Sequence, residues 1–318
     1  MENLNNEKTN AKAMERLIAA AEAGEAEALY CLGFCYFRGD CVEQDYQEAA
    51  KWFYKAAEQG IDEAQYCLGL CYDNGYGVEE DKTEAVKWYR LAAEQGYKEA
   101  QCNLGVCYYT GQGIEKNYTE AVKWYRLAAE QSDANAQYNL GTCYEDGYGI
   151  EQDYSEAAKW YQLSSEQDFT KAHYRLGICY DKGHGVEEDK TKAARLFRIA
   201  AEQGYAPAQF ILGKAYYLGN CVVKSNIKAK EWIEKAIKQD YNQALIFAEE
   251  HPDLFSPIQN TYNVSGDVIH DNHGIIAKDD AIVNRANVSD TETNFCPQCG
   301  QKVDAGDMFC RKCGRKLV

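Results

Sequence analysis

Apolar residues return along the first 250 residues at helical spacings, and polar turns separate the stripes. In residues 64–96, Ala64, Leu68 and Tyr72 lie four positions apart, so they share one face of a predicted helix. A wider stripe with small residues follows after a polar gap, at Ala85, Trp88, Tyr89, Ala92 and Ala93. This stretch therefore predicts two amphipathic helices joined by a loop.

The pattern repeats with a period of 36 residues. A glycine follows the leucine of the first helix in every unit: Gly33, Gly69, Gly105, Gly141, Gly177 and Gly213. A fixed period of this length is typical of one supersecondary unit stacked on copies of itself. Because glycine inside a helix costs about 1 kcal/mol relative to alanine, we expect the second helix of each unit to approach closely there.

Turn and cap residues separate the two helices of each unit. A glycine six residues after the mid-helix glycine, as at Gly75, predicts the end of the first helix. Four units add a second turn glycine, as at Gly77, but the first and last units have Cys41 and Cys221 there, so we expect those two loops to differ in conformation. Capping boxes are predicted at the start of the second helix in four units: Asp45 with Glu48, Asp81 with Glu84, Asn117 with Glu120 and Asp153 with Glu156.

The unit reads A-x-x-x-L-G-x-x-Y-x-x-G-x-G-V, then D-x-x-x-A-x-x-W-Y-x-x-A-A-x-x-G. It resembles the Sel1-like repeat, a relative of the tetratricopeptide repeat, over about residues 9 to 250. The resemblance implies an all-α fold, a right-handed α-solenoid of about six 36-residue helix-turn-helix repeats that serves as an adaptor or scaffold. We assign residues 9–252 to this solenoid, with a half-repeat covering each end of the stack.

The composition changes after the solenoid. Residues 253–294 are rich in Asn, Asp and Ser, which predicts a flexible polar linker. A short hairpin of Ile275–Ile276 with Ile282–Val283 is the alternative. Residues 295–318 then resemble the small zinc ribbons appended to many prokaryotic proteins, and we expect a β-hairpin module. Four cysteines there have the spacing C-x2-C-x10-C-x2-C: Cys296, Cys299, Cys310 and Cys313. Two such pairs would complete a tetrahedron around one structural Zn²⁺ and leave no coordination position for water or substrate. The alternative is that the four cysteines form two accidental disulfides.

The remaining cysteines bear on the compartment. Cys35, Cys71, Cys107, Cys143 and Cys179 occupy one slot of the repeat. Equivalent slots of neighbouring units lie about 8–10 Å apart, beyond disulfide reach, so we interpret these residues as small buried side chains in a reducing compartment. The chain shows no leader pattern and no stretch near the roughly 18 apolar residues that span a bilayer. We therefore expect a cytoplasmic protein without membrane contact.

The charge is strongly negative and unevenly spread. The formal net charge is −16, with 27 basic and 41 acidic residues in 1–252. Residues 253–294 carry 2 basic and 7 acidic residues, and residues 295–318 carry 5 basic and 2 acidic residues. An acidic body repels phosphate backbones, so nucleic acid is an unfavourable partner, and only the C-terminal tail could favour it.

One face of the first helix is a candidate partner surface. Aromatic residues recur three positions before the mid-helix glycine, at Tyr30, Tyr66, Tyr138 and Tyr174. Acidic residues on the same face, among them Asp73 and Asp181, would edge this strip with negative charge. Such a surface suits a basic protein or peptide with apolar anchors. The alternative, that the rings are simple inter-repeat core, stays open, whereas Tyr72, Tyr108, Trp88 and Trp124 are predicted to pack in the core.

No nucleophile, general base or phosphate-binding loop is recognisable, which argues against an enzyme. We therefore interpret the chain as a non-enzymatic adaptor that presents a solenoid groove to a protein or peptide, with the zinc ribbon as a second docking module. The rival hypothesis is a nucleic-acid-associated regulator in which the zinc ribbon contacts DNA or RNA.

Overall fold

The structure of the 318-residue chain is a computed structural model, and it describes residues 2–255, 268–271, 274–277, 294–295 and 302–303. The helices are α1 (Glu2–Glu22), α2 (Ala26–Arg38), α3 (Tyr46–Glu58), α4 (Asp62–Asn74), α5 (Lys82–Glu94), α6 (Lys98–Thr110), α7 (Tyr118–Glu130), α8 (Ala134–Asp146), α9 (Tyr154–Glu166), α10 (Thr170–Lys182), α11 (Lys190–Glu202), α12 (Ala206–Leu218), α13 (Asn226–Ile237), α14 (Asn242–Glu250) and α15 (Pro252–Phe255). The strands are β1 (Val268–Asp271), β2 (Gly274–Ala277), β3 (Asn294–Phe295) and β4 (Lys302–Val303).

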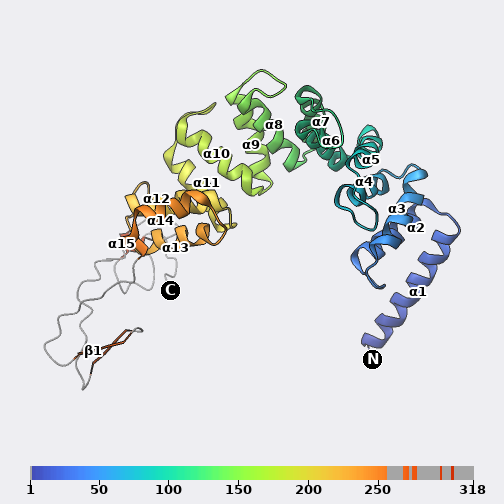
Figure 1. The fold of residues 1–318 in the computed structure, drawn as a ribbon, viewed down its shortest axis with the longest axis horizontal. Helices are drawn as coiled ribbons and strands as arrows, with labels where there is room; N and C mark the ends of the chain where they lie inside the picture. The colour runs from blue at the N-terminus through green and yellow to red at the C-terminus, as the bar shows by residue number, and fades with distance from the viewer. Residues whose placement is uncertain (1, 256–267, 272–273, 278–293, 296–301, 304–318) are drawn as a thin grey trace.

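Helices α2 to α13 form six packed pairs that stack in chain order. The first helix of each pair packs against the second, as α4 does against α5, and the second packs against the first helix of the next pair. The pairs follow one another along an arch, with α1 at one end and α12 to α15 at the other (Figure 1). Helix α1 begins at Glu2, ahead of the apolar spacing that starts near Thr9, and α14 packs on α13. The predicted all-α solenoid is confirmed.

Small residues and one aromatic ring per unit fill the core. In the second unit, Ala64, Ala85 and Ala92 are completely or almost completely buried, and Tyr89 has no exposed surface. Tyr72 and Trp88 are only partly buried and pack against this core from its edge, as Tyr108 and Trp124 do in the third unit. The ring that occupies the interior is therefore the aromatic residue that follows the tryptophan.

The mid-helix glycine lies against that buried ring. A Cβ atom added at Gly69 would lie 2.6 Å from the Cδ1 and Cε1 atoms of Tyr89, closer than side chains pack. The predicted close approach of the second helix is confirmed.

The start of each second helix differs from the prediction in one respect. The Asp45 carboxylate accepts hydrogen bonds from the backbone N–H groups of Gln47 and Glu48, at 2.9 and 3.0 Å, as an N-cap should. The Asp45 backbone N–H, however, donates to the carbonyl of Tyr36 at 3.0 Å, and the Glu48 carboxylate pairs with Lys51 at 2.6 Å. The predicted capping box is wrong, because the Asp45 N–H group that the Glu48 carboxylate would reach already donates to a carbonyl of the first helix.

The loops at Cys41 and Cys221 keep the conformation of the other units. Their φ angles are 63° and 57°, beside 70° at Gly77. The expected difference in backbone conformation is wrong, since cysteine adopts the left-handed region here despite its cost. The four glycines are needed for a different reason, because a Cβ at Gly77 would lie 1.9 Å from the carbonyl oxygen of Tyr46 in the preceding unit.

Beyond the solenoid the structure describes two antiparallel strand pairs. Strand β1 pairs with β2, with Ile269 opposite Ile276, inside the region predicted as a linker. Strand β3 pairs with β4, with Phe295 opposite Lys302. The four predicted zinc ligands and the rest of the linker lie outside the described residues. Among the helices that are described, none is long and apolar enough to cross a bilayer.

Candidate functional site: an aromatic strip along the first helices

The predicted aromatic positions form a strip that crosses several of the junctions between units. Tyr66 lies 6.0 Å, between ring centroids, from Tyr89 of its own unit and 5.1 Å from Tyr97, which precedes the next first helix. The same arrangement recurs in later units, and we call the following residues the aromatic strip: Tyr30, Tyr66, Tyr97, Tyr138, Phe169, Tyr174, Tyr205, Phe210 and Tyr241.

The rings of the strip are neither simple core nor free surface. Tyr66, Tyr138 and Tyr174 are half-buried: each packs on two rings and keeps part of its own ring exposed. Burial raises the pKa of Tyr66 to about 12, so its hydroxyl stays protonated at neutral pH. The sequence left open whether these rings form a partner surface or an inter-repeat core. Both are partly correct, because the rings join the units and also present an edge to solvent.

The strip is interrupted at the third unit. Cys102 occupies the position of the tyrosine, and Asp133 occupies the position of the aromatic residue before the next helix. Both are buried, and the Asp133 carboxylate accepts a hydrogen bond from the backbone N–H of Ala136 at 2.7 Å. The strip therefore has two aromatic stretches, one over units one to three and one over units four to six.

The acidic residues predicted to edge the strip are held in local contacts. Asp73 accepts a hydrogen bond from the Tyr89 hydroxyl at 3.2 Å and pairs with Lys82 at 3.1 Å. Asp181 pairs with Lys190 at 3.3 Å. Because lysines neutralise both carboxylates, these two positions add less negative charge to the surface than the sequence suggested.

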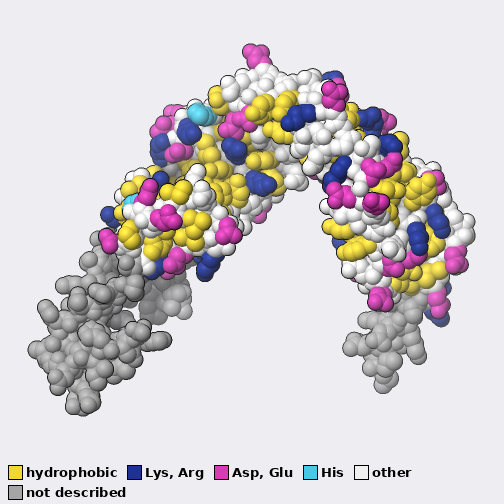
Figure 2. Space-filling view, in the orientation of Figure 1, with side chains coloured by type: hydrophobic (Ala, Val, Ile, Leu, Met, Phe, Trp, Pro, Cys, Tyr) yellow, Lys and Arg dark blue, Asp and Glu magenta, His cyan; other side chains and the backbone are white. Residues whose placement is uncertain are grey.

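Charge on the first helices changes sign along the stack. The position six residues before the mid-helix glycine is acidic in units one to three, at Glu27, Glu63 and Glu99, and basic in unit five, at Lys171. A hydrogen bond with Asp62 raises the pKa of Glu63, and the negative charges of Asp62 and Glu27 act in the same direction. Units five and six add cations on the first helices, at Arg175, Lys182 and Lys214. Dark blue side chains lie among yellow ones over α9 to α11 (Figure 2). The sequence reasoning noted the acidic positions and missed the basic ones.

A ladder of glutamines joins the units, and the sequence reasoning missed it as well. Gln65 is buried and donates to the carbonyl of Ala57 in the previous unit at 3.2 Å, while its own oxygen accepts from Gln95 at 2.8 Å. The same pairing recurs at Gln101 with Gln131, Gln137 with Gln167 and Gln209 with Gln239. Glutamine at two fixed slots of the repeat was the available signal.

The fifth unit replaces this pairing with a histidine. His173 is buried, with its Nδ1 atom 2.7 Å from the Ser165 hydroxyl and its Nε2 atom 3.0 Å from the Asp168 carboxylate. Gln203 also donates to Asp168 at 2.6 Å. The hydrogen bonds from His173 and Gln203 hold the pKa of Asp168 below its usual value, so the carboxylate remains an acceptor at neutral pH.

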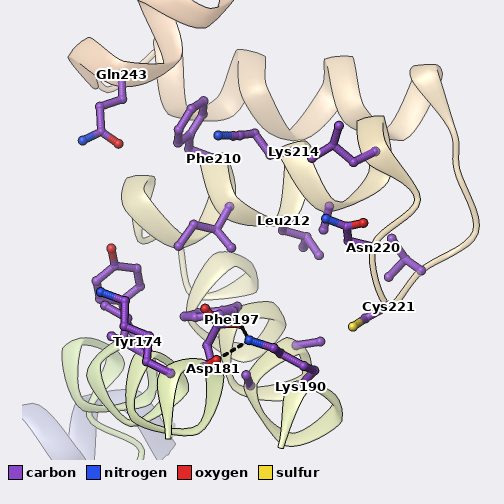
Figure 3. A pocket seen from close by; sticks show the side chains of 18 of the residues that line it. Tyr174, Asp181, Lys190, Phe197, Phe210, Leu212, Lys214, Asn220, Cys221 and Gln243 are labelled. Atoms are coloured by element: carbon purple, nitrogen blue, oxygen red, sulfur yellow. Dashed lines mark hydrogen bonds and ion pairs between the residues drawn. The ribbon is translucent and has the colours of Figure 1, made fainter. Parts of the chain in front are cut away.

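A cavity of about 520 Å³ opens on the strip between units five and six. Tyr174 from α10, Phe197 from α11 and Phe210 from α12 line it, with Gln243 at one end and Asn220 and Cys221 at the other (Figure 3). Tyr241 also lines it. Lys214 lies over the ring of Phe210, 5.4 Å from its centroid. The cavity combines apolar walls with cationic groups.

Exposed aromatic pairs on the loop edge form a second candidate surface. Tyr46 stacks on Tyr76 at 5.2 Å, and Tyr118 stacks on Tyr148 at 4.9 Å. Each pair joins neighbouring units, and Tyr76 and Tyr148 are exposed by 37% and 41%. At the junction between these two pairs, Lys82 occupies the tyrosine position and is held by Asp73. This surface, like the strip, is discontinuous.

The zinc prediction rests on the donor set. Strand β3 ends immediately before Cys296, and β4 begins three residues after Cys299, so the first cysteine pair falls between two paired strands in the sequence. Four cysteine thiolates suit Zn²⁺ and would hold it as a closed structural site. In the residues that the structure describes, no cluster of His, Cys, Asp and Glu could hold a metal ion.

Comparisons with known proteins agree with the geometry. Six consecutive segments match the Sel1 repeat, at residues 26–61, 62–97, 98–133, 134–169, 170–205 and 206–247, and residues 295–317 match a zinc-ribbon domain. A solved protective antigen present in uropathogenic Escherichia coli strains, which displays an SLR fold, is 38% identical with a TM-score of 0.68 over 76% of this chain. The match covers 52% of that protein, so this chain spans about half its length.

A second solved structure is similar over nearly its whole length. The Sel1 repeat protein from Oxalobacter formigenes is 35% identical with a TM-score of 0.67, over 74% of this chain and 94% of that one. No curated protein matches the sequence.

Proposed function

This chain belongs to the Sel1 repeat family, whose members are generally protein-interaction scaffolds, and we propose that it is a non-enzymatic adaptor that binds a segment of a partner protein along the aromatic strip. One observation carries this proposal: half-buried rings recur at the same position of the repeat at several unit junctions. Rings already fixed by packing lose little entropy on binding, and aromatic side chains are the common anchors of protein interfaces.

The cysteines of the core support the non-enzymatic part of the proposal. Burial raises the pKa of Cys71 and of Cys143 to about 12, so both thiols stay protonated at neutral pH. A protonated, buried thiol is a poor nucleophile and a poor metal ligand. These repeated cysteines therefore act as small apolar residues, which fits a reducing compartment and our proposal of a cytoplasmic location.

The zinc ribbon would act as a second docking module. Cys296, Cys299, Cys310 and Cys313 would hold one structural Zn²⁺, and the metal would supply the folding energy that so short a segment lacks. Its match to a zinc-ribbon domain supports this role.

The proposal is tested by blocking the strip without removing any contact. Asn135 is exposed on α8, at the centre of the stack and on the face that carries the strip, so Asn135→Trp should obstruct a bound segment. Gln162→Trp, at an exposed position on the second helix α9, is the matched control. Proteins captured from a lysate by the full chain should be compared by quantitative mass spectrometry across the two variants.

We expect a specific protein to be lost with Asn135→Trp and kept with Gln162→Trp. Equal capture by both variants would place the binding surface elsewhere, with the loop-edge tyrosines Tyr76 and Tyr148 as the next candidates. The competing hypothesis of nucleic-acid contact through the ribbon predicts DNA or RNA binding that falls steeply with salt, which filter binding at low and moderate salt measures.

A further inference from the structure

The cavity between units five and six is lined by residues of α10, α11 and α12. Its volume, about 520 Å³, lies in the range of ligand pockets and holds a bulky side chain with room to spare. Its lining is mainly apolar, with Tyr174 and Ile178 from α10, Phe197 from α11, and Phe210 and Leu212 from α12. An apolar side chain that enters the cavity is removed from contact with water on several sides at once.

The junction at this cavity departs from the repeat. At the preceding junction a Cβ on Gly185 would lie 2.0 Å from the carbonyl of Tyr154, so that loop rests directly on the unit before it. At the last junction Cys221 occupies the glycine slot, and its side chain lines the cavity. Lys214 stands where units one, two, three and five have an apolar residue after the mid-helix glycine. Two substitutions thus distinguish this junction.

Two cations at this cavity have no carboxylate partner in the described part of the chain. Lys182 and Lys214 both line the cavity, and no described Asp or Glu lies within ion-pair distance of either nitrogen. Lys190, by contrast, is held by Asp181 at 3.3 Å (Figure 3) and by Glu188 at 3.4 Å. In a chain with a net charge of −16, two such lysines beside an apolar cavity are a local reversal of the prevailing charge.

We propose that this cavity receives a bulky apolar side chain from an acidic segment of a partner protein, and that the carboxylates beside it pair with Lys182 and Lys214. The proposal rests on the proposed adaptor function and specifies the chemistry of one end of the bound segment. Charge complementarity selects the occupant, because carboxylates gain from the two lysines and lysines or arginines do not. Units one to three carry acidic residues on their first helices, at Glu27, Glu63 and Glu99. These residues repel the acidic end of the bound segment, so the segment binds in one direction.

The experiment uses the full chain and three fluorescein-labelled synthetic peptides. The first has a central tryptophan flanked on each side by two aspartates. The second has lysines in place of the aspartates, and the third has glycine in place of the tryptophan. Fluorescence polarisation should show that the first peptide binds about tenfold more tightly than either of the others, and that raising the salt from 50 to 300 mM weakens it.

Protein variants locate the site. Lys182→Glu with Lys214→Glu should weaken the first peptide about tenfold or more, because both charge pairs become repulsive. Both lysines are exposed, so the helical circular dichroism should not change. Lys12→Glu with Lys238→Glu makes the same change in net charge at exposed positions outside the cavity lining and should leave the affinity unchanged.

Three results would overturn the inference. They are equal binding of the aspartate and lysine peptides, no loss when the tryptophan is replaced, and equal effects of the two pairs of lysine variants. Tighter binding of the lysine peptide would refute the acidic occupant and leave the adaptor proposal intact. Failure of the adaptor proposal is recognised separately, when Asn135→Trp captures the same proteins as its control.

Discussion

Gly105 shows how one absent side chain sets the distance between two helices. A Cβ there would lie 2.6 Å from Cδ1 and 2.7 Å from Cε1 of Tyr125, and 3.3 Å from the carbonyl oxygen of Ala121. Overpacking of a core costs about 1–3 kcal/mol, and alanine returns about 1 kcal/mol of helix propensity. We expect Gly105→Ala to lower the free energy of unfolding by up to about 2 kcal/mol, measured by urea denaturation.

A double-mutant cycle provides the control for Gly105→Ala. In a Tyr125→Ala background the added methyl group meets the space that the ring has left, so Gly105→Ala should cost less than about 0.5 kcal/mol there. The same loss in both backgrounds would mean that the glycine is needed for another reason, such as its contact with the Ala121 carbonyl.

Glu63 carries charge at a cost to stability. Its pKa is raised, first by the hydrogen bond with Asp62 and also by the charges of Asp62 and Glu27, so folding favours the protonated carboxyl. A carboxyl group whose pKa is raised by folding stabilises the folded state fully at pH values below its pKa in the unfolded chain, about 4.3. This stabilisation is lost as the pH rises through its pKa in the folded chain. Glu63→Gln should therefore raise the melting temperature at pH 7, by a stability gain of about 0.2–0.5 kcal/mol.

The pH dependence distinguishes this effect from a general benefit of glutamine. The difference between Glu63→Gln and the native chain should shrink as the pH approaches 4 and vanish near 3, where both side chains are uncharged. Glu130→Gln, at an exposed position on α7, is the matched control. A loss of stability for Glu63→Gln at pH 7 would contradict the prediction.

At the scale of the element, the start of α5 separates a true cap from an apparent one. Asp81 accepts from the backbone N–H groups of Thr83 and Glu84, at 2.9 and 3.0 Å, while the Glu84 side chain pairs with Lys87. Asp81→Ala should lower the free energy of unfolding by about 1 kcal/mol. Glu84→Gln removes only an exposed ion pair and should cost less than about 0.5 kcal/mol. Equal losses of stability for Asp81→Ala and Glu84→Gln would support the capping box after all.

The sequence predicted the helices better than the contacts of their ends. Apolar spacing and turn glycines were enough to place α4 and α5, because amphipathic periodicity is a local property. The partner of the Asp81 N–H group is the carbonyl of Tyr72, a contact between two helices that no local pattern specifies. The pairing of Gln65 with Gln95 has the same origin, since it depends on where two loops meet.

At the scale of the whole molecule, the helical wheel predicted which face carries the aromatic strip but not what surrounds it. Tyr66 lies on the predicted face, yet its contacts with Tyr89 and Tyr97 depend on how adjacent units are rotated. The pairing of Asp73 with Lys82 brings a first helix and a second helix together. The cavity beside Lys214 was beyond sequence reasoning, because a void is set by the fit of two units rather than by either one.

The zinc ribbon tests whether the chain is built from independent parts. A solenoid unit contacts only its neighbours, and α14 and α15 pack on α13 at the end of the stack. Cys310→Ser with Cys313→Ser should therefore remove the zinc, measured as metal per chain by elemental analysis, and leave the helical circular dichroism and melting temperature nearly unchanged. Zinc affinity should also fall as the pH is lowered, because protons compete for thiolates.

Two exposed solenoid cysteines provide the control for the ribbon. Cys31→Ser with Cys41→Ser removes the same number of thiols, and both positions are exposed on the first unit. This variant should keep one zinc per chain, because four ribbon thiolates complete the tetrahedron without help from the solenoid. If the ribbon variant kept stoichiometric zinc, the metal would have to lie elsewhere. If it melted at a much lower temperature, the ribbon would be part of the solenoid's folding unit and not a separate docking module.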